Sequence, residues 1–223
     1  MGLNISTDTL EILKNFSQIN QNLLIKEGNK LSTIAAMKNV LAFVEVSEDF
    51  PVQCGIYDLN EFLGVVSLFD TPDIEFKKDH MLIEEGPNRS KYFFADESLL
   101  VLPPKKKLEM PNVVIEFVLE EADYNFLVKA AATMQLPDLT LSSNGKKMRL
   151  SVHDKKVKTS HDYSIEVGDS DTKFEMNFKS ENMKILPGNY DVEVAKEKIA
   201  RFINQDIELQ YFIALEPDSV YDN

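Results

Sequence analysis

The chain has 223 residues, of which 43% are hydrophobic and 27% are charged, and its formal net charge is −13. This composition is ordinary for a globular protein and excludes a disordered chain, while the length allows one large domain or two of about a hundred residues each. Such an acidic balance also argues against a protein that grips nucleic acid by neutralising many phosphates.

Cysteine content and hydropathy indicate where the protein works. Cys54 is the single cysteine, which rules out an intramolecular disulfide and fits a reducing cytoplasm. No secretory peptide opens the sequence, and no apolar run approaches the roughly 20 residues of a membrane-spanning helix. We therefore expect no membrane partner.

The first half is predicted to begin with a short strand over residues 2–5 and an amphipathic helix over residues 6–20. Leu10, Leu13 and Phe16 lie on an apolar stripe at helical spacing, and Ser6 or Thr7 suits the N-cap. The other side of this helix is polar and carries Glu11, Lys14, Asn15 and Gln18. Alternating strands follow, and residues 57–69 predict a second helix that exposes Asn60 and Ser67.

An extended connector is predicted over residues 99–111, between a first domain at 1–98 and a second at 112–223. Pro103 and Pro104 stand in tandem there and force an extended segment that lacks backbone donors. The cationic run Lys105–Lys107 follows them.

The second half repeats the plan of the first. Residues 112–119 predict a strand, residues 120–134 a helix that exposes Asn125 and Lys129, and residues 179–186 a further helix that exposes Lys179 and Lys184. Period-2 runs between turn residues, such as 139–143 and 173–179, are typical of antiparallel sheets with one buried face. The sequence therefore predicts an α+β fold of two similar β-rich domains with two helices each.

Lysine, asparagine, glutamine and serine dominate the outward faces of the four predicted helices. Most acidic residues are displaced to helix ends, strands and turns. Two interpretations stay open from the residues alone: an ordinary solvated helix face, or a mildly basic surface inside an acidic molecule.

Signals of catalysis are poor. His80, His153 and His161 are isolated and lack the spacing of metal ligands, and Cys54 beside an apolar strand is best explained as a buried structural thiol. The sequence contains no phosphate-binding glycine loop and no hydrolase or zinc-protease motif. We expect no catalytic residues, no metal site and no cofactor.

Four collinear blocks carry a resemblance to a known family. They are LEILKNFSQIN at 10–20, YDLNEFLGVVSLF at 57–69, ENMKILPGNYDVEV at 181–194 and YFIALEPDSVYDN at 211–223. Together they resemble the sliding clamp of T4-like bacteriophages, the processivity factor of the DNA polymerase. The resemblance implies two similar domains per chain, three chains per closed head-to-tail ring, and helices that line a hole around duplex DNA.

The resemblance also implies partners and a location. These are duplex DNA held without sequence specificity, the replicative DNA polymerase, and an ATP-driven clamp-loader complex, all in the cytoplasm of the infected bacterial host. The residues expected to face DNA are Lys14, Asn15, Gln18, Asn60, Ser67, Asn125, Lys129, Lys179 and Lys184. Because Glu11 shares a face with Lys14, we expect the charge of the inner surface to be modest.

Two further surfaces follow from the resemblance. Ring closure would pair edge strands at 91–95 and 157–167, through Lys91, Tyr92, Phe93, Phe94, Val157, Tyr163 and Ile165. An apolar pocket near the connector and the C-terminal segment would bind the polymerase or the loader, through Val40, Leu100, Leu102, Pro103, Ala214, Leu215 and Pro217. Simple packing of the connector onto a sheet is the competing explanation of this apolar set.

Two alternatives from other classes remain. Duplicated β domains also build ring-forming structural proteins of virus particles, which would not raise polymerase processivity. A metal-dependent nuclease that uses scattered acids such as Asp70 and Asp73 is the less favoured alternative, and it would require magnesium-dependent cleavage of DNA.

Overall fold

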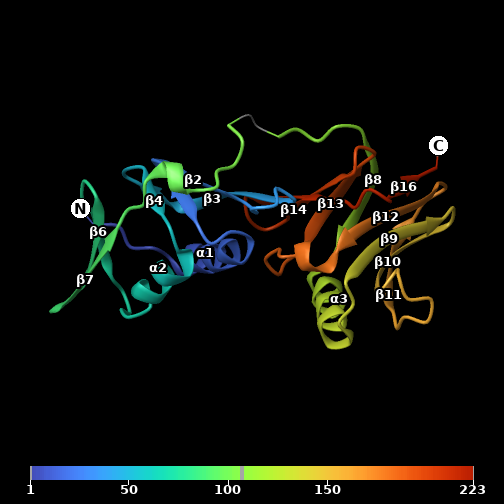
Figure 1. The fold of residues 1–223 in the computed structure, drawn as a ribbon, viewed down its shortest axis with the longest axis horizontal. Helices are drawn as coiled ribbons and strands as arrows, with labels where there is room; N and C mark the ends of the chain where they lie inside the picture. The colour runs from blue at the N-terminus through green and yellow to red at the C-terminus, as the bar shows by residue number, and fades with distance from the viewer. Residues whose placement is uncertain (1, 106–107, 223) are drawn as a thin grey trace. The chain divides into compact units, whose positions relative to one another are not determined.

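The computed structural model describes residues 2–105 and 108–222 and divides the chain into two compact units, within 1–106 and within 107–223 (Figure 1). Among the described residues the fold is mostly sheet with three α-helices, which confirms the predicted α+β class. Lys106 and Lys107 of the predicted connector lie outside the described residues. The finer boundaries at 98/99 and 111/112 stay a prediction.

The first unit opens with a helix and continues mainly as strands. Its elements are α1 (Thr7–Ile19), β1 (Leu23–Ile25), β2 (Gly28–Ile34), β3 (Val40–Phe50), β4 (Cys54–Ile56), α2 (Leu59–Val66), β5 (Asp73–Phe76), β6 (His80–Glu85), β7 (Asn88–Phe93) and the 3-10 turn η1 (Glu97–Leu99).

Capping and pairing define the first unit. The Ser6 hydroxyl accepts a hydrogen bond from the Thr9 N–H, as the sequence predicts for the N-cap of α1. β2 pairs with β3, β1 with β4, and β5–β6–β7 form an antiparallel meander. The strand predicted over 2–5 is reduced to a single bridge between Leu3 and Ile74.

The second unit has the same kind of order. Its elements are β8 (Val113–Leu119), α3 (Glu121–Met134), β9 (Asp138–Asn144), β10 (Lys147–His153), β11 (Tyr163–Asp169), β12 (Lys173–Lys179), the 3-10 turn η2 (Ser180–Asn182), β13 (Tyr190–Ala195), β14 (Ile199–Asn204), β15 (Leu209–Ala214) and β16 (Val220–Tyr221). One sheet has the strand order β11-β10-β9-β12-β16. In the other, β8, β13, β14 and β15 pair in that order.

The two units therefore repeat one plan. In the first, α1 is followed by β1 to β4, the helix α2, and the meander β5–β6–β7. In the second, α3 is followed by β9 to β12, the short turn η2, and the meander β13–β14–β15. This correspondence is the structural form of the repeat read from the sequence.

The fourth predicted helix, at 179–186, is wrong. Only the single 3-10 turn η2 forms, and Met183 and Ile185 are buried on either side of the exposed Lys184, which is a period-2 pattern. The Tyr124 hydroxyl lies 2.9 Å from the Met183 carbonyl oxygen and 3.0 Å from that of Ile185. Those carbonyls are thus turned toward a side chain instead of a following helical turn, and Pro187 disfavours helical backbone just before it.

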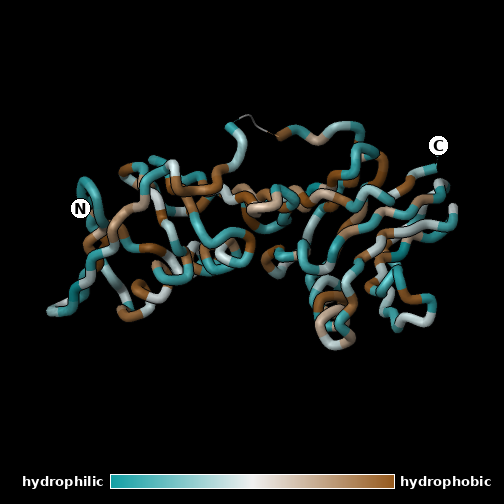
Figure 2. The backbone as a smooth tube through the Cα atoms, in the orientation of Figure 1, coloured by the Kyte–Doolittle hydropathy of each residue, from teal (hydrophilic) through white to brown (hydrophobic). Residues whose placement is uncertain are grey.

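Alternation along the strands places the core inside each unit. In β10 every second residue, Met148, Leu150 and Val152, is buried, and hydrophobic and hydrophilic segments alternate along the strands of both units (Figure 2). Phe16, Phe50 and Phe62 are fully buried in the first unit, and Tyr190 and Tyr211 in the second. Each such side chain contributes about 1.5–3 kcal/mol by leaving water.

Candidate nucleic-acid interface

The first unit presents its predicted DNA-facing residues on two helices that contact each other, α1 and α2 (Figure 1). Lys14 and Gln18 on α1 are exposed, as is Asn60 on α2. Ser67, at the C-cap of α2, is exposed as well, and its hydroxyl donates to the Gly64 carbonyl at 2.7 Å.

Asn15 is a correction, because it is 6% exposed and not on the open face of α1. The helix contacts α2 as well as β2 and β3, so its buried arc is wider than the apolar stripe in the sequence. The same packing buries Thr9, whose hydroxyl donates to Glu48 at 2.5 Å.

In the second unit, Asn125 and Lys129 lie one helical turn apart on the exposed side of α3. Lys184 is also exposed, but on the irregular segment after η2 and not on a helix. These positions place exposed polar and cationic residues on α3 and on the segment after η2.

Lys179 has a different environment, since its ammonium lies 2.6 Å from the Asp138 carboxylate. Asp138 is 1% exposed, and its second oxygen accepts the Lys155 N–H at 3.1 Å. Burial by itself raises the pKa of the Asp138 carboxyl, but the hydrogen bonds from Lys179 and Lys155 outweigh it and hold that pKa below its usual value. The charge of Lys179 is thereby neutralised within the unit, and a DNA-facing role for it remains a prediction that this geometry does not favour.

Acidic side chains share the helix faces with the cations. Glu11 is exposed on α1, three residues before Lys14, and Glu61 is exposed on α2, next along the chain to Asn60. With a Debye length of about 8 Å at physiological salt, such a mixed surface attracts phosphates only weakly. A weak field of this kind suits mobile contact with DNA and not a fixed grip.

The predicted assembly strands both lie at sheet edges. β7 is the last strand of β5–β6–β7, and β11 is the first strand of its five-stranded sheet. Two bounds were wrong: Phe94 lies beyond the end of β7, and Val157 lies in the turn region before β11, which begins at Tyr163. The Asp154 carbonyl accepts the Val157 N–H, and this local turn keeps residue 157 out of the strand.

The residues predicted for the partner pocket fall in both units. In the first, Val40 and Leu100 are buried and Leu102 and Pro103 are half-buried. Asn22 Oδ1 accepts the Val101 N–H at 2.9 Å and so fixes the start of the connector. In the second, Leu215 is buried, Ala214 half-buried and Pro217 exposed.

The C-terminal segment is anchored within the second unit. Glu216 donates its N–H to the Asn177 carbonyl at 2.7 Å, and the Ser219 hydroxyl accepts the Asn177 N–H at 2.9 Å. Lys155 forms an ion pair with Asp218 at 2.7 Å. The tail that carries the predicted pocket residues therefore has a fixed conformation before any partner arrives.

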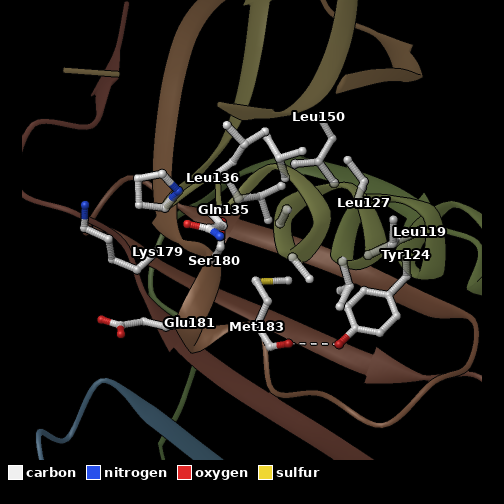
Figure 3. A pocket seen from close by; sticks show the side chains of 16 residues that line it. Leu119, Tyr124, Leu127, Gln135, Leu136, Leu150, Lys179, Ser180, Glu181 and Met183 are labelled. Atoms are coloured by element: carbon white, nitrogen blue, oxygen red, sulfur yellow. Dashed lines mark hydrogen bonds between the residues drawn. The ribbon is translucent and has the colours of Figure 1, made fainter. Parts of the chain in front are cut away.

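A pocket of about 510 Å³ lies in the second unit, beneath α3, and the sequence did not predict it (Figure 3). Its wall is apolar and includes Leu127, Leu136, Leu150 and Met183, while Lys179 and Glu181 stand at its margin. Ser180 and Glu181 of η2, the turn in place of the expected helix, line part of it. None of the residues predicted for the partner pocket lines it.

Solved structures share this duplicated fold. The chain matches PCNA of A. fulgidus with a TM-score of 0.67 at 11% identity, over 95% of this chain and 96% of that one. It matches the DNA polymerase III β subunit, the sliding clamp of Bartonella birtlesii, with a TM-score of 0.70 at 12% identity, over 96% of this chain and 64% of that one. At these identities the likeness establishes the fold alone, which is that of the DNA clamps.

Sequence comparisons then give the family. Residues 6–102 match the family described as DNA polymerase processivity factor, and residues 116–217 match the gp45 sliding clamp, C terminal. The sliding clamp of Vibrio phage KVP40 is 30% identical over 96% of this chain and 99% of its own. That of Escherichia phage RB69 is 28% identical over 99% of this chain and all of its own, 100%.

The chain belongs to the sliding clamp family of the T4-like bacteriophages. It is accordingly a processivity factor and not an enzyme, and the matches give no support to the virus-particle or nuclease alternatives. Within the parts of the chain that the structure describes, no helix is long and apolar enough to cross a membrane.

Proposed function

We propose that three copies of this chain close head to tail into a ring around duplex DNA and tether the replicative DNA polymerase to its template. The observation that carries the proposal is the duplicated clamp fold with an edge strand in each unit, β7 in the first and β11 in the second. Unpaired edges of this kind are a liability on a soluble protein, and pairing between copies removes it.

The charge distribution supports encirclement in place of tight binding. A net charge of −13 per chain repels DNA from most of the surface, whereas Lys14 and Lys129 lie exposed on helices. We assign DNA contact to these cations, assisted by Gln18, Asn60 and Asn125. Retention then depends on the topology of the ring and not on neutralised phosphates, so the ring can move along DNA of any sequence.

Partner binding is assigned to the apolar residues of the connector and of the C-terminal segment, centred on Leu102. The Val101 N–H donates to the Asn22 side chain and the Glu216 N–H to the Asn177 carbonyl, so both segments are held in place and little order has to be gained on binding. A related fold offers a parallel, because a Helicobacter pylori β clamp has been solved with a DNA ligase peptide. In the infected bacterial cytoplasm, an ATP-driven loader would open the ring, since this sequence has no nucleotide-binding motif.

A primer-extension assay tests the tethering role. With the cognate polymerase and loader, the wild-type chain should lengthen the products of a single binding event, and Leu102→Asp should abolish that gain because a charge enters an apolar contact. Ile207→Asp is the control, since this residue is exposed in the turn before β15 and lies outside the predicted pocket.

The ring must persist in the Leu102→Asp variant for the assay to be decisive. Light scattering should give about 76 kDa for wild type and variant alike, three times the 25.4 kDa of one chain. Loss of the trimer in Leu102→Asp would place this residue in the assembly instead of the partner pocket. Unchanged product lengths with an intact ring would remove Leu102 from the tethering surface.

A further inference from the structure

β7 has two chemically distinct faces. Tyr92 points to the helix side, where its ring lies 5.3 Å from that of Phe62 on α2 and its hydroxyl donates to the Asp58 carbonyl at 3.2 Å. Lys91 and Phe93 lie on the opposite face and are exposed, with the Phe93 ring 5.4 Å from that of His80. Among the described residues the Lys91 ammonium has no hydrogen-bond or ion-pair partner.

β11 has a matching pair of faces. Ile165 is half-buried and stands opposite Leu150, on the buried face of β10. Glu166 is on the other face, opposite Arg149, and its carboxylate lies 2.8 Å from the Lys147 ammonium. Lys147 also reaches Asp169 at 2.9 Å, so one ammonium serves two carboxylates on this edge strand.

Resting on the proposed ring, we propose that β7 of one copy pairs antiparallel with β11 of the next in the register that sets Lys91 opposite Glu166. Tyr92 then stands opposite Ile165, and Phe93 opposite Ser164. Every strand pair that the structure describes within the two units is antiparallel, as this one would be.

This register satisfies both faces at once. On the helix side it continues an apolar row from Met81 through Tyr92 to Ile165 and Leu150 of the neighbouring copy. On the outer side it places Glu166 between two cations, Lys91 of one copy and Arg149 of the other. Opposite charges directly across a strand pair are favourable, and like charges are not.

Neighbouring registers break one match or the other. A slip by one residue sets Tyr92 opposite Ser164 or Glu166, which belong to the outer face of β11, because side chains alternate along a strand. A slip by two residues in one direction sets Lys91 opposite Ser164 and Ser90 opposite Ile165. Tyr92 then meets Tyr163, and the cation opposite Glu166 is Arg89, which already lies 3.4 Å from Glu84 in its own unit. A slip by two in the other direction sets Phe93 opposite Glu166 and leaves Lys91 opposite Gly168. The irregularity that the β10–β11 pair shows near Met148 lies beyond the matched residues 164–166.

Cysteine cross-linking reads this register directly. The pair Lys91→Cys with Glu166→Cys should form disulfides between copies under oxidised glutathione, giving covalent dimers and trimers on a denaturing gel, because directly opposed residues have Cβ atoms about 4.5–5.5 Å apart. The matched control, Lys91→Cys with Ser164→Cys, should stay monomeric on that gel. The native Cys54 is 2% exposed and does not compete.

The possible results distinguish a wrong register from a wrong ring. Light scattering of both cysteine variants under reducing conditions establishes whether the trimer is present. A trimer that cross-links through residue 164 as readily as through 166, or through neither, overturns the register while the ring stands. A wild-type chain that stays monomeric contradicts the ring itself and this pairing with it, and a cross-link within one chain contradicts the pairing alone.

Charge reversal tests the ion pair in the same register. Lys91→Glu should raise the concentration at which half of the trimer dissociates by about tenfold, because two carboxylates then face each other. Adding Glu166→Lys to that variant should bring the concentration back below that of either single variant. Equal or weaker assembly of the double variant would show that the two side chains do not meet.

Discussion

Asp138 is the most completely buried carboxylate of the second unit, and its charge is balanced by Lys179 and the Lys155 N–H. Asp138→Asn keeps the size of the side chain but leaves the partly buried Lys179 ammonium without its anion. We expect it to lower the free energy of unfolding by about 3 kcal/mol at pH 7, as measured by urea denaturation. Asp162→Asn, at an exposed position, is the control and should change little.

The ion pair between Asp138 and Lys179 also makes the free energy of unfolding depend on pH. The pKa of Asp138 is lowered in the folded state. Its contribution to the free energy of unfolding is therefore present above the pKa of the unfolded chain, about 3.9, and is lost as the pH falls through the pKa of the folded state. The pKa of Lys179 is raised chiefly by its hydrogen bond to Asp138, so its contribution persists through neutral pH and fades only in strong base. The stability gap between wild type and Asp138→Asn should therefore narrow below about pH 4. A gap that is constant down to the acid end of the transition would show that the ion pair is not its source.

Single residues also show which features could be predicted from the sequence and which could not. Helical spacing correctly placed Lys14, Gln18 and Lys129 on exposed faces, because position on a helix is a local property. It missed the burial of Asn15, which depends on α2 covering a second flank of α1, and the pairing of Lys179, which depends on Asp138 from another strand. Tertiary contacts of this kind have no signature within a few residues of sequence.

At the scale of elements, strands and long helices followed their patterns and the segment at 179–186 did not. Its composition suits a helix, yet the Tyr124 hydroxyl holds the carbonyls of Met183 and Ile185. That contact joins α3 to a stretch about 60 residues later, so periodicity in the segment itself does not reveal it. The edge positions of β7 and β11 were expected only through the family resemblance, because the alternating pattern within a strand does not show which other strands pair with it.

Tyr124→Phe tests this contact by removing one oxygen atom. Two buried carbonyls lose their donor, so the free energy of unfolding should fall by about 1–2 kcal/mol, while circular dichroism should show no gain of helix because Pro187 remains. Tyr57→Phe is the matched control, because Tyr57 is 59% exposed. An equal loss in both variants would mean that the Tyr124 hydroxyl does not organise the segment.

The whole molecule combines an acidic surface with a duplicated fold that has open edges. The sequence predicted the repeat and the class, because both follow from patterns sustained over many residues. It did not predict the pocket beneath α3, which is lined in part by the short turn η2 that stands in place of the expected helix. A ring made of such chains would hold DNA by enclosing it, and its affinity for free DNA ends would be low.

Retention on circular and linear DNA measures enclosure most directly. The chain is loaded onto a nicked circular duplex by the cognate loader with ATP, separated from free protein, and divided into an untreated half and a half cut once by a restriction enzyme. We predict that it stays on the circle and leaves the linear DNA by sliding off the ends, with little dependence on sequence. Equal retention on both forms, with a dissociation that salt alone controls, would contradict a topological clamp.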